Sequence, residues 1–254
     1  MQLIPCFLNR FVLPGLLVTA LMATHTAFAD GVVAELSGTI SVKRDDGRLI
    51  LSRGSKVQEG DVVTTEKDSY AQIRFSDGAV MTLKPSTSIA IKEHRFSEQE
   101  PEKDSSTFSL IKGGLRTVSG LIGKRGNRDA YKMNTATATI GIRGTVFDVD
   151  DCATTSCVKD NQTATDNKGS SSSDKQTANE EVLVAAVYVG VRDGEVVVKN
   201  DAGELVLSAG QFGIAPATNV LPTKLPGNPG LSQISSMANE STVKGEGFEI
   251  RNCK

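Results

Sequence analysis

The sequence predicts an all-β fold, a solenoid-like stack of short strands, and three observations support this prediction. Apolar and polar residues alternate in short runs rich in Val and Ile, which is the period of a strand with one buried face. Asp-Gly steps separate several runs, and such steps favour tight hairpin turns. Large rings are scarce, with no Trp and 3 Tyr among 254 residues, so the core should be thin and aliphatic.

Residues 1–29 have the order of a secretory signal peptide. Arg10 precedes an apolar run over residues 11–23, and Ala27-Phe28-Ala29 is a small-x-small cleavage site. The alternative is a retained membrane anchor, but the run is short for a bilayer and contains Pro14. We therefore expect cleavage after Ala29 and a periplasmic mature protein, with secretion or surface attachment as the alternative.

Charge and hydropathy narrow the classes of partner. The chain has 28 Lys and Arg against 30 Asp and Glu, and loss of Arg10 with the signal peptide changes the net charge from −2 to −3. A near-neutral, exported protein is a poor candidate for binding nucleic acid. After residue 29, no second apolar run is long enough to span a bilayer, so we expect no integral membrane segment after cleavage.

Alternation and turn signals run through most of the chain after residue 29. Frequent turns also fit a sandwich or a barrel, but the scarcity of aromatic side chains favours the solenoid-like stack. The clearest predicted strands are 40–42, 71–75, 81–83, 89–91 and 187–191, and the clearest predicted turns are Asp46-Gly47, Asp77-Gly78 and Asp193-Gly194.

The predicted domain covers residues 30–217. Residues 158–180 form a polar insertion with four consecutive serines, and they lack the apolar side chains that would offset the entropy of ordering. We expect this insertion to be disordered, like a shorter charged linker at 96–106. A Pro- and Gly-containing tail, also expected to lack regular structure, occupies residues 218–254.

Three cysteines follow the signal peptide, and an oxidising compartment favours their pairing. Cys152 and Cys157 lie close enough in sequence to close a small loop, while Cys253 is an alternative partner near the C-terminus. Free thiols are a less favoured alternative. A metal site at these cysteines is less favoured than free thiols, because their spacing is not that of a CxxC pair and His94 is far away in sequence.

Catalytic motifs are missing from the sequence. No GxSxG, HExxH or phosphate-binding glycine loop occurs, and no motif joins His94 to a serine and a carboxylate. Asp150-Asp151 has no EF-hand or RTX-type spacing around it. We therefore predict a protein that is not an enzyme and that uses no cofactor or metal.

A basic loop, Gly123–Asp129, offers one candidate binding site through Lys124, Arg125 and Arg128. The favoured interpretation is a solvated turn, since charge runs usually face water. The functional alternative is a site for an anionic glycan, a lipid headgroup or an acidic partner strand.

The order of motifs from Gly38 to about Ala217 resembles the FecR domain family. Residues 60–65 and 69–79 follow the family's opening pattern, which ends in Asp77-Gly78. The most specific signature is Asn134–Val149, NTATATIGIRGTVFDV, which carries Gly141, Arg143, Gly144, Thr145 and Phe147. These five residues are interpreted as mainly structural. Arg143 could dock a partner carboxylate, but we favour a role in tying neighbouring strands together.

The resemblance implies a twisted, solenoid-like β domain on the outer side of the inner membrane. In the namesake regulators this domain follows a cytoplasmic anti-sigma segment and a membrane helix, and it receives a signal from a TonB-dependent transporter. This sequence departs from that plan, so the resemblance implies a stand-alone exported member that does not itself reach a sigma factor.

Three hypotheses for function follow. The first is a periplasmic binding or scaffold module that engages another envelope protein through a sheet edge, with a role in signal transduction. The second is an exported module that binds a glycan or a surface through the basic loop. The third is a signal receiver for a separately encoded membrane regulator.

Overall fold

The computed structural model describes residues 30–127, 129–153, 157 and 183–231, and these residues form 15 strands and one short 3₁₀ helix. The predicted signal peptide, Arg128, the predicted insertion at 158–180 and Cys253 lie outside the described residues. The elements are β1 Gly31–Ser37, β2 Ile40–Arg44, β3 Gly47–Ile50, β4 Lys56–Val57, β5 Val62–Thr65, β6 Tyr70–Phe75, β7 Val80–Leu83, β8 Ser88–Arg95, η1 Pro101–Lys103, β9 Ser105–Val118, β10 Tyr131–Asn134, β11 Thr139–Asp151, β12 Val187–Asn200, β13 Gly203–Ser208, β14 Phe212–Ala215 and β15 Thr223–Leu225.

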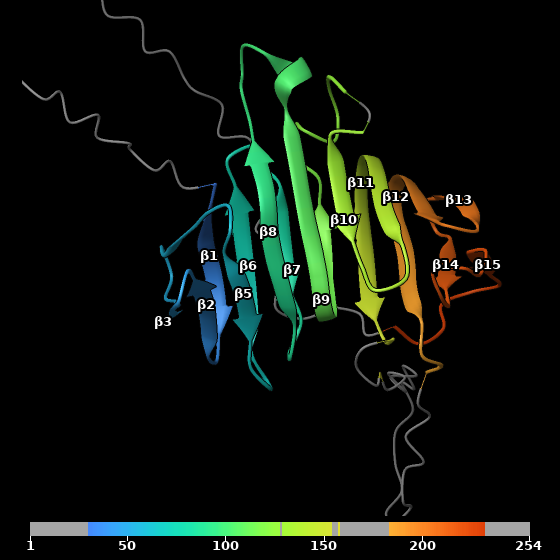
Figure 1. The fold of residues 1–254 in the computed structure, drawn as a ribbon, viewed down its shortest axis with the longest axis horizontal. Helices are drawn as coiled ribbons and strands as arrows, with labels where there is room; N and C mark the ends of the chain where they lie inside the picture. The colour runs from blue at the N-terminus through green and yellow to red at the C-terminus, as the bar shows by residue number, and fades with distance from the viewer. Residues whose placement is uncertain (1–29, 128, 154–156, 158–182, 232–254) are drawn as a thin grey trace, which may run out of the picture.

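The strands form two layers that share their long strands. One layer, here sheet I, has the order β4-β1-β6-β7-β9-β11-β12-β14-β15. The other layer, sheet II, has the order β3-β2-β5-β8-β9-β10-β11-β12-β13. The chain advances from one end of the molecule, at β1 to β3, to the other, at β13 to β15 (Figure 1). The predicted all-β class is confirmed.

Each long strand passes from one sheet to the other at a bend. The first part of β9 pairs with β8 and β10, whereas its last four residues pair with β7. The bends in β9, β11 and β12 contain Gly113, Gly144 and Gly194, whose φ values are +82°, +62° and +78°. Glycine adopts this left-handed conformation without the steric cost of a Cβ atom. The family signature therefore includes the bend of β11.

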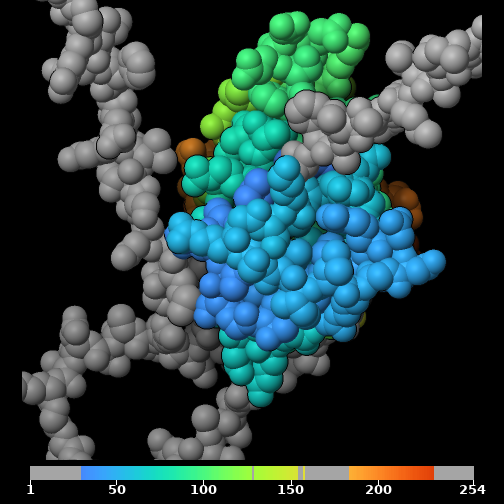
Figure 2. Space-filling model, turned by 90° about the vertical axis from the view of Figure 1, so that its left-hand side faces the viewer, coloured from blue at the N-terminus to red at the C-terminus, as the bar shows by residue number. Residues whose placement is uncertain are grey.

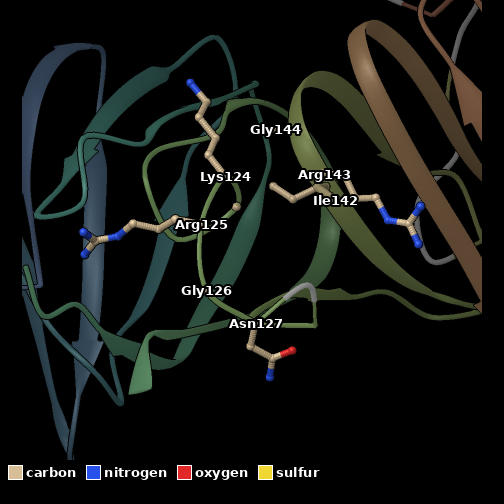
Figure 3. Close-up of a pocket in the computed structure, with 8 residues that line it drawn as sticks. Lys124, Arg125, Gly126, Asn127, Ile142, Arg143 and Gly144 are labelled. Carbon is tan, nitrogen blue, oxygen red and sulfur yellow. The ribbon is translucent and has the colours of Figure 1, made fainter. Parts of the chain in front are cut away.

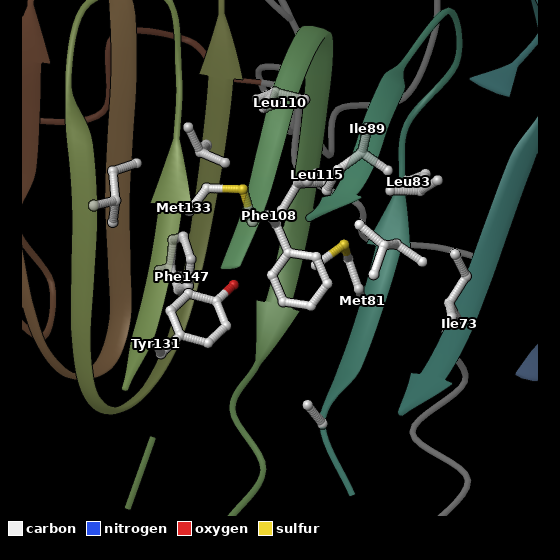
Figure 4. Packing of buried hydrophobic residues seen from close by; sticks show 14 of the residues in the cluster. Ile73, Met81, Leu83, Ile89, Phe108, Leu110, Leu115, Tyr131, Met133 and Phe147 are labelled. Atoms are coloured by element: carbon white, nitrogen blue, oxygen red, sulfur yellow. The ribbon is translucent and has the colours of Figure 1, made fainter. Parts of the chain in front are cut away.

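The core between the sheets is mainly aliphatic, as predicted, but a line of rings crosses it. Phe108 lies between Phe75 and Tyr131, with ring centroids 5.0 and 5.7 Å away. Tyr131 in turn lies edge-on to Phe147 at 6.3 Å. Figure 4 shows Phe108, Tyr131 and Phe147 among Met and branched aliphatic side chains. Four aromatic side chains, Phe75, Phe108, Tyr131 and Phe147, thus belong to the main core.

A second, smaller cluster lies at the C-terminal end of sheet I. Cys152, Leu183, Ala186, Tyr188 and Leu231 are buried together in it. The ordered fold therefore continues beyond the predicted domain boundary at residue 217, through β15 and on to Leu231. No helix in the described part of the chain is long and apolar enough to cross a membrane.

Candidate functional site

The signature residues lie at the bend of β11 and in the core. Phe147 is fully buried between the sheets. The Gly144 N–H donates to the Gly123 carbonyl at 2.7 Å, and the Thr145 N–H donates to the Ser119 hydroxyl at 2.9 Å. These bonds join the bend to the loop that follows β9. Gly141 has open space where a side chain would begin, so close packing does not explain the glycine there.

Arg143 lies at the surface on the first half of β11. Its guanidinium Nη1 donates to the Glu195 carboxylate at 2.7 Å, and Glu195 is its direct neighbour on β12. Both side chains are exposed to solvent, so the pair adds little stability by itself. The structure thus gives Arg143 a carboxylate partner from an adjacent strand.

The basic loop and β11 line a shallow pocket of about 490 Å³. Its lining includes Lys124, Arg125, Arg143 and three glycines, with no carboxylate. In Figure 3 the charged ends of these three side chains point in different directions. The structure therefore does not bring their charges together around one anion.

Arg125 joins the basic loop to the segment between β8 and β9. Its guanidinium donates to the Ser97 carbonyl at 2.7 Å and to the Asp104 carboxylate at 3.3 Å, and it lies over the Phe96 ring. Asp104 is buried and also accepts the Ser97 N–H. The prediction that 96–106 is a disordered linker is therefore wrong, because a buried carboxylate and a stacked guanidinium order this polar segment.

A cluster of buried charges lies on the outer face of sheet I. The Lys84 Nζ donates to both Asp150 oxygens at 2.7 and 2.8 Å. Asp148 accepts from Arg116 Nε at 2.9 Å and from Arg192 Nε at 2.7 Å. Sequence reasoning missed this cluster, since its members are up to 108 positions apart and meet only through the pairing of β7, β9, β11 and β12.

His94 bridges the two sheets in the core. Its Nε2 lies 3.0 Å from the Ser76 hydroxyl and its Nδ1 lies 3.0 Å from the Ser106 hydroxyl. Burial lowers the pKa of His94, although the charges of Asp77, Asp30 and Asp104 act in the opposite direction. His94 is thus a neutral core residue with both nitrogens in use, which sequence alone did not reveal.

Two strand edges of sheet II are open in the described part of the fold. β3 pairs only with β2, and β13 pairs only with β12. Each edge presents exposed aliphatic side chains, at 55% for Leu49 and 68% for Ile50 on β3 and at 46% for Val206 on β13. An open strand edge with apolar side chains is a site where another strand can add.

The cysteine pairing is Cys152 to Cys157. This was one of the alternatives that the sequence left open, and Cys253 lies outside the described residues. The Leu183 N–H donates to the Cys157 carbonyl at 2.9 Å. Cys157 and Leu183, the described residues on either side of the polar insertion, are therefore adjacent beside the disulfide.

A comparison with protein families matches residues 61–164 to the family described as FecR protein. Residues 61–164 are similar to the FecR domain. The match covers β5 to β11 and includes the signature at the β11 bend, so it agrees with the resemblance seen in the sequence.

Two crystal structures of a "putative anti-sigma factor" from Parabacteroides distasonis ATCC 8503, at 1.65 and 2.50 Å resolution, are similar to this chain. Both share 15% sequence identity with it, with TM-scores of 0.40 and 0.41. The alignments cover 65% of this chain, and this chain spans 59% of the length of those structures. No curated protein sequence matches the chain.

Proposed function

We propose that this FecR-domain protein is a non-enzymatic regulatory module of the cell envelope that binds another envelope protein. The FecR match supports regulation, and the order of residues 1–29 supports export. The observation that carries the binding proposal is the open edge of β13 with an apolar patch beside it.

The backbone of β13 can accept a further strand. Asn200 pairs with Gly203 across a two-residue turn, and the two residues that flank such a turn form a hydrogen-bonded pair. Hydrogen-bonded and non-hydrogen-bonded pairs alternate along the hairpin, so Glu204 and Val206 belong to non-hydrogen-bonded pairs. The N–H and C=O groups of Glu204 and Val206 then point away from β12. A partner strand would satisfy these groups through backbone bonds, as in β-augmentation.

The side chains beside this edge supply an apolar anchor. Val206, Val220 and Leu221 are 46–50% exposed. The Asn200 side-chain Nδ2 donates to the carbonyls of Ala217 and Val220 at 2.8 and 2.7 Å. These bonds place the 217–221 segment against the β12–β13 hairpin. A central apolar group beside backbone donors and acceptors is typical of a strand-binding edge.

Export is part of the proposal. Cleavage after Ala29 would make Asp30 the first residue, and Asp30 is already bonded into the fold. Its N–H donates to the Val57 carbonyl at 3.1 Å, and its carboxylate accepts the Glu59 N–H. A mature chain that begins here would keep β1 in sheet I.

The experiment is in-cell crosslinking of the tagged protein, followed by purification and mass spectrometry, with wild type and Val206→Pro compared. Proline removes the outward N–H of residue 206 and leaves the bonds between β12 and β13 intact. We expect one dominant envelope protein with wild type and its loss with Val206→Pro. Val118→Lys, at a similarly exposed valine on sheet I, is the control and should keep the partner.

Two results would contradict this proposal. A partner retained by Val206→Pro would exclude the β13 edge as its binding site. A protein that crosslinks to nothing would favour the glycan-binding alternative, whose test is salt-dependent polysaccharide binding by wild type and Lys124→Ala. The alternative that the protein receives a signal for a separate membrane regulator is tested by deleting its coding sequence. A change in transcription would support this alternative.

A further inference from the structure

The opposite edge of sheet II, β3, forms part of the N-terminal end of the molecule. Figure 2 shows this end, where the blue surface belongs to the first strands. β3 is the second strand of a hairpin whose turn is Asp45-Asp46, and all four of its residues are exposed. Leu49 and Ile50 are the most exposed large apolar side chains of sheet II.

The free backbone groups of β3 can be assigned from its pairing with β2. Arg44 pairs with Gly47 across the turn, and the Leu51 N–H donates to the Ile40 carbonyl at 2.9 Å. Hydrogen-bonded and non-hydrogen-bonded pairs alternate along an antiparallel ladder. The N–H and C=O groups of Arg48 and Ile50 therefore point outward, and those of Leu49 point to β2.

We propose that the β3 edge binds the β3 edge of a second copy of this chain, in an antiparallel pair about a two-fold axis through Leu49. In this register Arg48 of each copy lies opposite Ile50 of the other. These are the two residues whose backbone groups point outward, so the two pairs exchange four hydrogen bonds. The edge is thus complementary to itself, as a two-fold interface requires.

The side chains fit the same register. Leu49 lies opposite the buried Val42 of β2, on the core side of sheet II. At the two-fold axis the Leu49 side chains of both copies would meet and extend the two cores toward each other. Ile50 lies on the outer face and would pack beside Arg48 of the second copy.

Charge does not oppose this pairing. Arg48 Nη2 already donates to the Glu66 carboxylate at 2.6 Å, so the facing strands carry little unbalanced charge.

The size of the edge decides the strength of the association. A strand of four residues buries less than the roughly 1,000 Å² expected of a stable interface. The pair should therefore form in a concentration-dependent way, with monomer dominating in dilute solution. This association uses the end of sheet II opposite to the β13 edge, so it does not depend on the proposed function.

Sedimentation velocity of the purified protein over a concentration series tests the proposal. We expect the wild type to shift from monomer to dimer as concentration rises. Ile50→Pro removes an outward N–H from each copy and should raise the dissociation constant at least about tenfold. Val206→Pro, the same change at the other edge, is the matched control and should dimerise as the wild type does.

The register has its own test, which does not depend on a proline variant folding. Cα atoms of a non-hydrogen-bonded antiparallel pair are about 4.5 Å apart, a distance that a disulfide can span. With Cys253 replaced by serine, Leu49→Cys should form a disulfide-linked dimer under mild oxidation. Arg48→Cys, whose partner is Ile50 and not itself, should not.

A monomer at every concentration, or no Leu49→Cys crosslink, would overturn the proposal. The proposal would also be overturned if the protein stays monomeric but binds an unrelated protein, and Ile50→Pro abolishes that binding. This result would assign the β3 edge to a strand of another protein. Loss of the envelope partner by Val206→Pro with dimerisation unchanged would separate this inference from the proposed function.

Discussion

At the scale of single residues, the buried polar groups determine how much this domain tolerates substitution. Lys84 and Asp150 are both buried and bonded to each other on the outer face of sheet I. Removal of one partner leaves an uncompensated charge in a poorly solvated place, which costs far more than the pair itself contributes. The Arg48–Glu66 pair is exposed, so removal of one partner there leaves a charge that water can solvate.

Lys84→Met should lower the free energy of unfolding by about 3–5 kcal/mol, because the Asp150 carboxylate would lose its buried cation. Arg48→Met removes the cation of an exposed pair and should cost at most about 1 kcal/mol. Urea denaturation of both variants measures the difference. Equal effects would show that the Lys84–Asp150 pair is no more desolvated than a surface pair.

His94 should make stability depend on pH. Because its pKa is lowered in the folded protein, the unfolded chain binds more protons once the pH falls below about 6.5, the ordinary value for histidine. The stability contributed by neutral His94 is therefore complete at pH 7.5 and is lost as the pH falls through 6.5. The raised pKa of Asp30 acts at lower pH and in the opposite sense.

Urea denaturation at pH 7.5 and pH 5.5 tests this expectation. The wild type should be less stable at the lower pH, and His94→Asn should reduce that difference. An unchanged pH dependence in His94→Asn would assign the effect to other groups.

At the scale of elements, the long strands are shaped by their glycines. Gly113, Gly144 and Gly194 each have positive φ where β9, β11 and β12 leave one sheet for the other. A side chain at Gly144 would have room, since its nearest neighbour would be the Lys124 Cγ at 3.4 Å. The requirement for glycine at 144 is thus one of backbone conformation and not of space.

Gly144→Ala should cost about 1–2 kcal/mol, which is the price of a left-handed backbone for a residue with a Cβ atom. Gly141→Ala, three residues earlier in the same strand, has open space and no positive φ. It should change stability by less than about 0.5 kcal/mol. Thermal unfolding of the two variants decides between conformational and packing roles for the signature glycines.

At the scale of the whole molecule, the domain carries a second small core on sheet I. The Cys152–Cys157 disulfide lies in this cluster, and Leu231 packs into it from beyond β15. Residues from the base of the insertion and from the C-terminal segment are therefore stabilised together.

Replacement of both Cys152 and Cys157 by serine should cost about 2 kcal/mol, the loop-entropy value for so short a closed loop. Denaturation of the variant, and of the wild type with and without reductant, measures this loss. A much larger loss would indicate that the second core collapses without the disulfide.

The sequence was sufficient for the fold class and the FecR signature, because these depend on local chemistry. Of the three predicted Asp-Gly turns, Asp77-Gly78 is confirmed. Asp193-Gly194 is wrong, since it lies in the bend of β12, and the β2–β3 turn is one residue earlier than predicted, at Asp45-Asp46. Apolar residues at alternate positions predicted strands such as β6 and β7, and Asp77-Gly78 predicted the turn between them. The motif Asn134–Val149 carried the family resemblance within 16 consecutive residues.

The tertiary structure decided the features that depend on residues far apart in the chain. Pairing of β7, β9, β11 and β12 brings Lys84 to Asp150 and Arg116 to Asp148. It also turns Arg125 toward Asp104, so the residues of the basic loop serve different contacts. Sequence patterns report which side of a strand is buried, whereas strand order and register determine which buried groups meet and which two edges of sheet II are left open.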